Sequence, residues 1–351
     1  MKRLFLCLPL LLLTACAPAE ARQQFFAMDT TMTVTLYGKG GADALTAVQQ
    51  EVFRLDGLFS RTKPNSDISR LNAGAGSLPQ GVEIGQDTGT LLAEAASIGE
   101  MTGGALDVTI APVMDAWGFG AAASFQESEF RVPTQAELDA LLPLVDSGKV
   151  HVNGHALGRL ARLDEPGMAV DLGAVAKGYA ADQVRDLLLE AGVTSALLDL
   201  GGNVTVMGTK ADGSPWRVGI KDPADPASSY CILSLSDKTA STSGGYERYF
   251  EENGVTYHHI IDPHTGYPAD SGLLAVTAVS ADGTLADGLS TACFVMGADK
   301  ALDLWRDQGE AQDFDLVLVG DDGHVFITEG LEAGLDFLGE GAGYTYEIVR
   351  R

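Results

Sequence analysis

Hydrophobic and polar positions follow different periods in different segments of the chain. Residues 25–38 alternate apolar and polar side chains, which predicts a strand with one buried face. Apolar residues recur every three or four positions in residues 44–59 and 88–101, which predicts two amphipathic helices. Thr134 and Glu137 have the spacing of a capping box and predict the start of another helix. The first part of the chain is therefore expected to contain both strands and helices.

The second half mixes strands and helices without regular alternation. Residues 193–281 are rich in strand patterns separated by Asp-Gly and Asn-Gly turns, and we expect the first strand at residues 195–208. Helical spacing returns at residues 285–296 and 298–308, and two strands close the chain within residues 314–330. Irregular mixing of this kind favours an α+β fold over a doubly wound parallel sheet.

The segment VDLGAVAKGYAADQV, residues 170–184, holds polar residues where a buried segment would not tolerate them. We expect a short strand that leads to Asp171, a turn at Gly173, and a helix that carries Lys177 in its first turns and ends at Gly192. Such a turn places backbone amides and the positive end of a helix beside a ligand's phosphate, and Lys177 adds a full charge. The alternative is that Asp171 only caps the helix and that Lys177 is solvated.

A second polar pattern lies in LADGLSTACFVMG, residues 285–297. In a helix, Asp287 and Thr291 share one face at i and i+4, and Ser290 lies beside them. A carboxylate and a hydroxyl are oxygen ligands, which suit Mg²⁺ or Ca²⁺ better than zinc. The alternative is a carboxylate at the start of the helix, favoured by the helix dipole, with a threonine that bonds back to its own helix.

Three further glycine-rich segments present polar side chains. Residues 257–268 are a strand that ends in a Pro-Gly loop, and either His258 or His259 points inward, where an imidazole needs a partner. Residues 242–245 offer hydroxyls and free amides after a strand, and Asp107 follows another Gly-rich turn. Each of these segments can also be read as an ordinary turn.

The first residues have the pattern of a bacterial lipoprotein signal. A basic start and a short apolar run precede Leu-Thr-Ala-Cys, which is typical of cleavage before a lipidated cysteine. The apolar run is shorter than the about 20 residues that span a bilayer. We therefore expect a signal peptide at residues 1–15, lipidation of Cys16, a lipidated tether at residues 16–24 and one domain at residues 25–345. The alternative is an uncleaved N-terminal helix.

Charge and cysteine content exclude several classes of function. Cleavage before Cys16 removes two basic residues and no acidic ones, which leaves 21 basic against 48 acidic residues, a net charge near −27. Such an excess repels nucleic acid and anionic lipid headgroups, so no nucleic-acid partner is expected. Cys231 and Cys293 are expected to be buried thiols and not a disulfide, and no Cys/His cluster indicates zinc or iron–sulfur binding. Walker A and G-x-S-x-G motifs are also missing.

Nine blocks, in order and in register from residue 28 to about residue 297, resemble the ApbE family of periplasmic flavin transferases, also called FAD:protein FMN transferases. They are MDTTM, FSRTKPNSDISRLN, TGGALDVTIAP followed by WGFG, DLGAVAKGYAAD, DLGGN, PWRVGI, TSGGYERYF, YHHIIDPHTGYP and LADGLSTACFVMG. The resemblance implies an α+β, T-fold-like architecture of mixed or antiparallel sheets with packed helices. It also implies Mg²⁺, FAD as substrate, and transfer of FMN from FAD to a threonine hydroxyl of a target protein with release of AMP.

The resemblance also implies roles for particular residues. The metal would be held by Asp287, Thr291 and the backbone carbonyl of Ala174, with Ser290 as a neighbour. His259 and Asp287 would be the catalytic residues, one of them taking the acceptor's proton. The FAD site would be lined by Met28, Ala105, Leu106, Asp107, Asp171, Lys177 and Ile261.

One block departs from the family pattern. Many members carry an aromatic residue between the positions of Arg61 and Pro64 that can stack on the flavin, whereas this chain has Thr62 and Lys63. Hydrolysis of FAD to FMN and AMP therefore competes with FMN transfer as the expected reaction, so a metal-dependent FAD pyrophosphatase is the first alternative. A lipoprotein that binds FAD without chemistry is the second.

The expected partners follow from the same resemblance. The acceptor would be a periplasmic threonine in a membrane subunit of a sodium-translocating NADH:quinone oxidoreductase (Nqr) or an Rnf-type complex. The protein would lie in the periplasm, lipid-anchored to the inner membrane.

Overall fold

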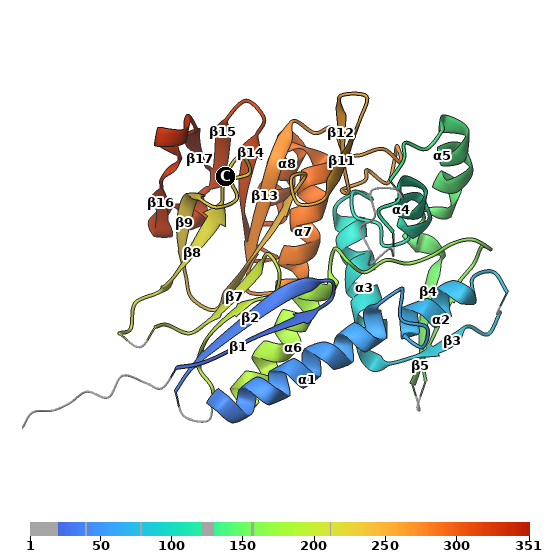
Figure 1. Cartoon of the computed structure of the whole chain (residues 1–351), viewed down its shortest axis with the longest axis horizontal. Helices are drawn as coiled ribbons and strands as arrows, with labels where there is room; N and C mark the ends of the chain where they lie inside the picture. The colour runs from blue at the N-terminus through green and yellow to red at the C-terminus, as the bar shows by residue number, and fades with distance from the viewer. Residues whose placement is uncertain (1–19, 39–40, 78, 121–129, 156–157, 211) are drawn as a thin grey trace, which may run out of the picture.

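A nine-stranded sheet organises the molecule (Figure 1). The computed structural model describes residues 20–38, 41–77, 79–120, 130–155, 158–210 and 212–351. Neighbouring strands of this sheet run antiparallel except the last pair, which is parallel. In spatial order the strands are β1 (Glu20–Ala27), β2 (Thr30–Tyr37), β6 (Ser195–Asp199), β7 (Asn203–Met207), β10 (Lys238–Gly244), β13 (Leu273–Ser280), β14 (Phe314–Gly320), β15 (His324–Thr328) and β17 (Thr345–Val349).

Helices cover one face of the large sheet. Helix α7 (Gly283–Met296) packs on β10 and β13, and α6 (Ala176–Glu190) lies between it and α1 (Gly41–Phe59). Helices α3 (Gln86–Met101) and α8 (Ala298–Gln308) pack against α7 from other sides. The main hydrophobic core lies between these helices and the sheet. Since apolar residues recur at helical spacing in each helix, each buries one face there.

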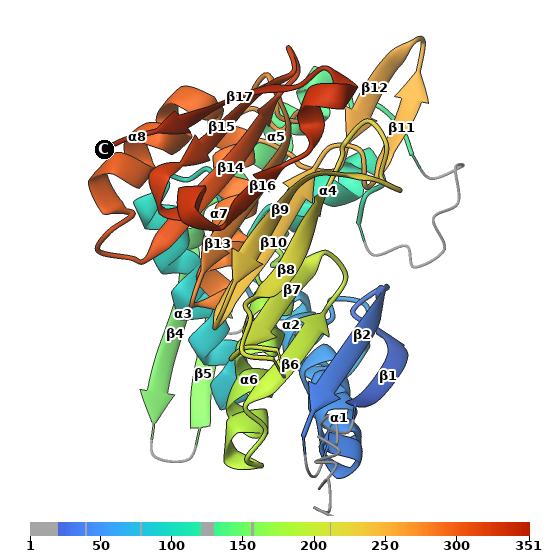
Figure 2. The same ribbon diagram turned by 90° about the vertical axis from the view of Figure 1, so that its left-hand side faces the viewer.

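A smaller sheet covers the opposite face (Figure 2). It consists of β8 (Trp216–Lys221), β9 (Ser229–Leu235) and β16 (Leu335–Phe337). Side chains of β8 alternate strictly between buried and exposed, as a strand with one covered face requires. A second hydrophobic core, which includes Val206 and Val317 of the large sheet, fills the space between the two sheets.

The remaining strands form a small third sheet and a separate hairpin. Strands β3 (Val82–Ile84), β5 (Gly158–Leu163) and β4 (Val150–His155) make a third sheet, and β11 (Tyr249–Glu252) and β12 (Val255–His258) form a projecting hairpin (Figure 1). This hairpin packs its aromatic residues on α4, around the buried Trp117. The other short elements are α2 (Asp67–Ala73), α4 (Ala111–Trp117), α5 (Gln135–Leu141) and the 3₁₀ turns at Leu142–Leu144, Ser147–Lys149, Glu329–Gly334 and Gly339–Ala342.

Most predicted helices are confirmed, with ends shifted by a few residues. The capping box of Thr134 and Glu137 is present at the start of α5. Gly192 follows α6 with a φ of 77°, the left-handed conformation expected of a glycine after a helix. Cys231 and Cys293 are buried free thiols, as expected.

Several strand predictions are wrong. Residues 195–208 are two antiparallel strands, β6 and β7, because Gly201 and Gly202 adopt positive φ and reverse the chain. Residues 25–38 are likewise divided between β1 and β2. The expected strand before Asp171 is only an extended segment with one bridge, between Ala169 and Ile110. The closing pair of strands is followed by β16 and β17.

Helices α6 and α7 approach each other at two glycines. A Cβ added to Gly178 would overlap the backbone carbonyl of Gly283 and would lie 2.8 Å from Cβ of Asp287. Glycine at position 178 therefore lets the two helix backbones touch, and this contact sets where Asp287 lies relative to the start of α6.

The predicted signal peptide at residues 1–15, Cys16 and the rest of the tether up to residue 19 lie outside the described residues. Residues 20–24, predicted as tether, instead belong to strand β1, because they pair with β2 along their whole length. Among the helices of the described ranges, none combines the length and apolarity needed to cross a membrane.

Candidate active site

The candidate active site is a cavity of about 490 Å³ between the helical layer and the loops around α4. This volume lies within the range of small-molecule sites. The cavity brings together the residues that the sequence analysis assigned to FAD, metal and catalysis, from five separate segments: Met28, Ala105, Leu106, Asp107, Asp171, Ala174, Lys177, His259, Ile261, Asp287 and Thr291.

Asp287 is held rigidly at one end of the cavity. Its side chain is only 4% exposed. Oδ2 accepts a hydrogen bond from the backbone N–H of Gly178 (2.9 Å), and Oδ1 accepts one from the hydroxyl of Ser241 (3.1 Å). The N–H groups of a first helical turn have no partner within the helix, so Asp287 of α7 caps α6 from outside.

The alternative explanation of Asp287 as a helix-start carboxylate is excluded by the geometry. Helix α7 begins after Asp282, whose side chain accepts from the N–H of Leu285 and is the true N-cap. Thr291 does not bond back to its own helix among the hydrogen bonds of the described residues. Its hydroxyl lies 3.1 Å from that of Ser243 on β10.

Ser290 is behind the cavity wall. It is fully buried, donates to the carbonyl of Asp287 (2.8 Å) and lies 2.8 Å from the Ser243 hydroxyl. Its role is therefore to fix the wall that carries Thr291, and it does not line the cavity within the described residues.

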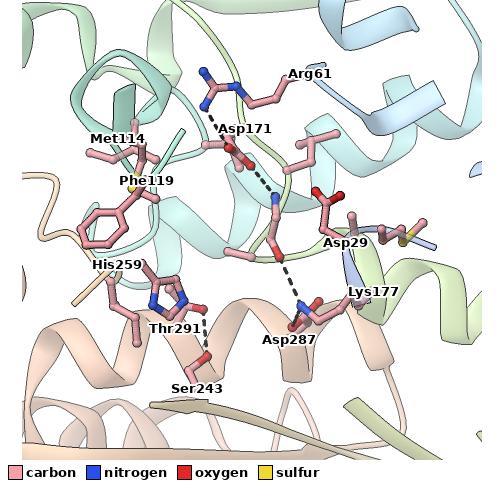
Figure 3. Close-up of a pocket in the computed structure, with 18 of the residues that line it drawn as sticks. Asp29, Arg61, Met114, Phe119, Asp171, Lys177, Ser243, His259, Asp287 and Thr291 are labelled. Carbon is pink, nitrogen blue, oxygen red and sulfur yellow. Dashed lines mark hydrogen bonds and ion pairs between the residues drawn. The ribbon is translucent and has the colours of Figure 1, made fainter. Parts of the chain in front are cut away.

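Lys177 faces Asp287 across the start of α6 (Figure 3). Its Nζ lies 3.8 Å from Oδ1 of Asp287 and donates to the backbone carbonyl of Gly173 at 3.3 Å. The side chain is 23% exposed, so Lys177 is a cavity residue and is not freely solvated.

Asp171 and Arg61 form a second charged group (Figure 3). Oδ1 of Asp171 accepts from the N–H of Gly173 (2.8 Å), so Asp171 orders the turn before α6, whose N-cap residue is Val175. Nη1 of Arg61 lies 3.2 Å from Oδ2 of Asp171, and Nη2 binds both oxygens of Asp115 at 2.6 Å. Arg61 thus joins the loop after α1 to α4 and to the Asp171 turn.

His259 lies in the cavity wall and is neutral. Its Nδ1 is 3.2 Å from the carbonyl of Arg248, and because a carbonyl only accepts, Nδ1 carries the proton. Loss of hydration, with the nearby Arg248, lowers the pKa of His259 to about 3. His258, the other candidate, instead packs edge-on against Phe294 of α7 and contacts the carbonyl of Ala269.

Met28 belongs to a strained turn that lines the cavity. Met28 and Asp29 connect β1 to β2 and have φ values of 48° and 59°, as in the two-residue hairpin turn with both central residues left-handed. Side chains other than glycine, asparagine or aspartate adopt this conformation at a cost, and such residues occur preferentially at functional sites.

Both carboxylate oxygens of Asp107 accept hydrogen bonds from other residues of the protein. One oxygen accepts from the N–H and hydroxyl of Thr109, and the other accepts from the N–H of Ser147 at 2.9 Å. Ala105 and Leu106, buried beside it, supply apolar wall, as does Ile261 on the opposite loop.

Sequence reasoning missed several cavity residues. Arg61 belongs to the block FSRTKPNSDISRLN, but nothing in the sequence pairs it with α4. Phe119 of the block WGFG also lines the cavity, with Met114 next to it (Figure 3). Arg248 and Glu247 were part of the block TSGGYERYF, which was the available signal, and Arg248 donates to the carbonyl of Phe119 (3.2 Å).

Acidic groups outnumber cations in this cavity. Asp29, Asp56, Asp107, Asp171, Glu247 and Asp287 line it, against Lys177, Arg61 and Arg248. Within the described ranges, no three His, Cys, Asp or Glu side chains converge as they would around a metal held by such side chains alone. An anionic ligand near Asp287 would thus depend on Lys177, backbone amides or an added cation.

Comparison with known proteins decides the family. The ApbE family pattern matches residues 28–314. The chain belongs to the ApbE family. It is 35% identical over 300 residues to the FAD:protein FMN transferase of Vibrio cholerae serotype O1, covering 84% of this chain and 87% of that one. It is 36% identical over 294 residues to the protein of the same name from Treponema pallidum, covering 79% of each.

Solved structures agree with the sequence relatives. The ApbE protein of Thermotoga maritima superposes with a TM-score of 0.80 at 30% identity, covering 90% of this chain and 99% of that chain. The flavin transferase ApbE of Vibrio cholerae gives 0.77 at 28% identity, with the same coverage. The predicted family and the predicted α+β fold of mixed sheets and packed helices are confirmed, and the family is one of enzymes.

Proposed function

We propose that this ApbE-family enzyme transfers FMN from FAD to a threonine hydroxyl of a target protein, with Mg²⁺, and releases AMP. The observation that carries the proposal is the joint position of Lys177, Asp287 and Thr291 on one wall of a cavity large enough for part of a dinucleotide. The names of the relatives, FAD:protein FMN transferases, supply the substrate and the reaction class.

The donor set fits a hard divalent cation. The Asp287 carboxylate, the Thr291 hydroxyl and the Ala174 carbonyl are all oxygen donors on the same cavity, which is what Mg²⁺ prefers. The ammonium group of Lys177, 3.8 Å from Asp287, already balances charge at this place. When bound, Mg²⁺ would neutralise negative charge on the pyrophosphate oxygens.

The chain's own residues would orient and stabilise the substrate. Lys177 would bind the phosphates, and its charge would also stabilise the AMP leaving group. Asp171, fixed by Gly173 and Arg61, would bind a polar edge or hydroxyl of FAD. Neutral His259, with Nδ1 bonded to a carbonyl, would accept a hydrogen bond through Nε2 and so orient the acceptor hydroxyl.

The proposed cellular location and membrane attachment rest on the first residues of the chain. We propose cleavage after residue 15, lipidation of Cys16 and a periplasmic position on the inner membrane. The proposed acceptors are periplasmic segments of Nqr- or Rnf-type membrane subunits. A lipid anchor would hold the enzyme beside such acceptors.

One reaction separates the three candidate functions. Purified protein is mixed with FAD, Mg²⁺ and a periplasmic fragment of an Nqr- or Rnf-type subunit, with its threonine-to-alanine form as the blank. Flavin bound covalently to the threonine form alone supports transfer, whereas free FMN and AMP with unmodified fragment would indicate a pyrophosphatase. Unchanged FAD would indicate a binding protein. Omission of Mg²⁺ with added EDTA should stop the reaction.

A further inference from the structure

The two edge strands of the large sheet differ in how well they are protected against further pairing. At one edge, β17 has five residues, carries Glu347 and is followed by Arg350, which pairs with Glu332. At the other edge, β1 pairs with β2 over eight consecutive residues without a bulge, and it contains no proline or lysine. Its charged residues, Glu20 and Arg22, lie in the first three positions. A long, regular edge without charges readily accepts another strand, and proteins normally protect such edges.

The outward-facing backbone groups of β1 follow from the geometry of its turn. The turn at residues 28–29 has two central residues, so Ala27 and Thr30, which flank it, form a hydrogen-bonded pair. Such pairs alternate with unbonded pairs, so the N–H and C=O groups of Gln24 and Phe26 point away from β2. Within the described residues, β1 pairs with β2 alone, and Figure 2 shows it at the margin of the sheet. These backbone groups are therefore available to a further strand.

An exposed aromatic side chain lies on each side of this edge. On the face of the sheet away from the helices, Phe26 is 66% exposed. On the helix face, Phe53 of α1 is 45% exposed and packs edge-on against Phe25, with ring centroids 5.7 Å apart. A strand added to β1 would place alternate side chains on these two aromatic surfaces. Backbone pairing combined with such side-chain contacts is a common way for proteins to bind an extended peptide.

The edge leads to the end of the cavity where the phosphates are expected. Strand β1 ends at the turn of Met28 and Asp29, and both residues line the cavity. In Figure 3, Asp29 lies on the same side of the cavity as Lys177, across from Phe119. A strand paired with residues 22–26 and continued by about three residues, or roughly 10 Å, would therefore reach the cavity beside Lys177.

We propose that the free edge of β1, with Phe26 and Phe53 beside it, is the docking site for an extended segment of the acceptor protein. This inference rests on the function proposed above, which requires a polypeptide to bring a threonine hydroxyl to the phosphates. The segment pairs its backbone with Gln24 and Phe26, rests an apolar side chain on one of the two aromatic surfaces, and carries its threonine past residues 28–29 into the cavity. Threonine suits this path, because β-branched residues favour extended backbone.

A second copy of the chain is the alternative occupant. Pairing of β1 with β1 would account for an unprotected edge. It would not account for an edge that ends at the cavity, beside Lys177. The acceptor segment accounts for both observations.

Four substitutions test the docking site. Gln24→Pro removes an N–H that points away from β2, so it should block pairing with an added strand and spare the pairing of β1 with β2. Gln24→Ala removes the same side chain and keeps the N–H. Phe26→Ser removes the exposed aromatic surface. Its matched control is Tyr346→Ser, because Tyr346 is 42% exposed on β17, at the opposite edge of the sheet.

For each variant we would measure kcat and KM for the Nqr- or Rnf-type fragment, FAD affinity, urea unfolding and sedimentation. Gln24→Pro and Phe26→Ser should each raise KM for the fragment by about tenfold or more, the scale of a central interface residue, with kcat nearly unchanged. FAD affinity should stay at the wild-type value, because neither residue lines the cavity. Gln24→Ala and Tyr346→Ser should match the wild type.

Several results would overturn the docking site. One is intact transfer with a KM within about twofold of the wild type in both Gln24→Pro and Phe26→Ser, which would leave the proposed function standing. Another is an equal rise of KM in Gln24→Ala or Tyr346→Ser. A wild-type dimer that Phe26→Ser dissociates, with KM unchanged, would assign the edge to a second copy. If Gln24→Pro unfolds at lower urea, Phe26→Ser decides alone. If the wild type itself does not modify the fragment, the proposed function fails, and this inference fails with it.

Discussion

The two charged groups of the cavity are built in opposite ways. At one, Asp287 is buried, bonded to the backbone of a neighbouring helix, and placed by a contact between two glycines. At the other, Asp171 and Arg61 lie on loops, and Arg61 reaches an Asp115 side chain that is half exposed. The first group cannot move without separating α6 from α7, whereas the second is held together by contacts between side chains on loops.

This difference suggests that the two charged groups have different roles, one in catalysis and the other in substrate binding. A metal and the reacting phosphates require fixed geometry, because small displacements of catalytic groups cost large factors in rate. Binding the rest of a large substrate tolerates adjustment. If this contrast is correct, changes at the helix contact should affect stability and rate together, and changes on the loops should affect mainly binding.

The largest effect is expected from Gly178→Ala. The new Cβ would meet the backbone of Gly283, which cannot rotate away as a side chain can, so α6 and α7 must separate. We expect a loss of about 3 kcal/mol or more in the free energy of unfolding, together with loss of transfer. Gly57→Ala, on α1 with open space around the added Cβ, is the matched control and should be neutral or stabilising. Urea unfolding and the transfer assay give both readouts.

Asp287→Ala should lower the rate of Mg²⁺-dependent turnover by about 10³-fold or more. It should also cost about 1–3 kcal/mol in stability, because the buried N–H of Gly178 loses its acceptor. Asp282→Ala removes the true N-cap of α7, at about 1 kcal/mol, and should leave turnover intact. Activity of Asp287→Ala near that of the wild type would contradict the metal assignment.

Lys177→Ala should weaken FAD affinity and slow turnover together, since its charge meets the phosphates in ground and transition states. Riboflavin lacks the phosphates, so its affinity should change little. Isothermal titration with both ligands provides the check. Equal weakening for riboflavin and FAD would place Lys177 away from the phosphates.

The packing of α6 against α7 should also appear in the pH dependence of stability. Burial raises the pKa of Asp182, on α6, to about 6, although Gly283 and Thr284 donate to it. A raised folded-state pKa stabilises the fold below the unfolded value near 4 and loses that contribution as pH rises through about 6. The loss should be on the order of 2–3 kcal/mol. Urea unfolding at pH 4.5 and 7 should show it in the wild type and not in Asp182→Asn, whereas the exposed Asp186→Asn should behave as the wild type.

The smallest effect is expected from a substitution of Thr62, in the loop after α1. Thr62 lines the cavity, with its hydroxyl 2.9 Å from that of Ser60, whereas Lys63 points to Asp56 instead. Thr62→Tyr should add a stacking surface of about 0.5–1.5 kcal/mol and shift bound FAD from hydrolysis towards transfer. Flavinylated fragment and free FMN would be measured in one reaction, with Lys63→Tyr as the control. An unchanged ratio would mean that residue 62 does not cover the flavin.

Local sequence signals predicted the helices well and the hairpins poorly. The apolar spacing of α1, α3 and α7 depends only on each helix's own residues, so it could be read directly. The turns at Met28–Asp29 and Gly201–Gly202 interrupt continuous strand patterns, and Met28 adopts a conformation that its residue type disfavours. Only pairing across the sheet reveals such a turn.

The candidate site shows the same limit. The motif residues could be named because the ApbE resemblance covers them in register. The partners of those residues could not, because Gly178 with Asp287 and Arg61 with Asp115 are joined only by packing between distant segments. Sequence reasoning therefore named residues that line the cavity, but it could not show that Asp287 is bonded to the backbone of α6.

The position of β1 limits where the enzyme can work. This strand runs from Glu20 to the cavity-lining turn at Met28, a length of about 27 Å at the rise of a strand. If Cys16 carries the proposed lipid, the four residue steps to Glu20 add at most about 14 Å. The cavity would then lie at most about 40 Å from the point where the lipid enters the bilayer. An acceptor threonine in a membrane protein would have to be presented within that height, which suits the short periplasmic segments proposed as acceptors.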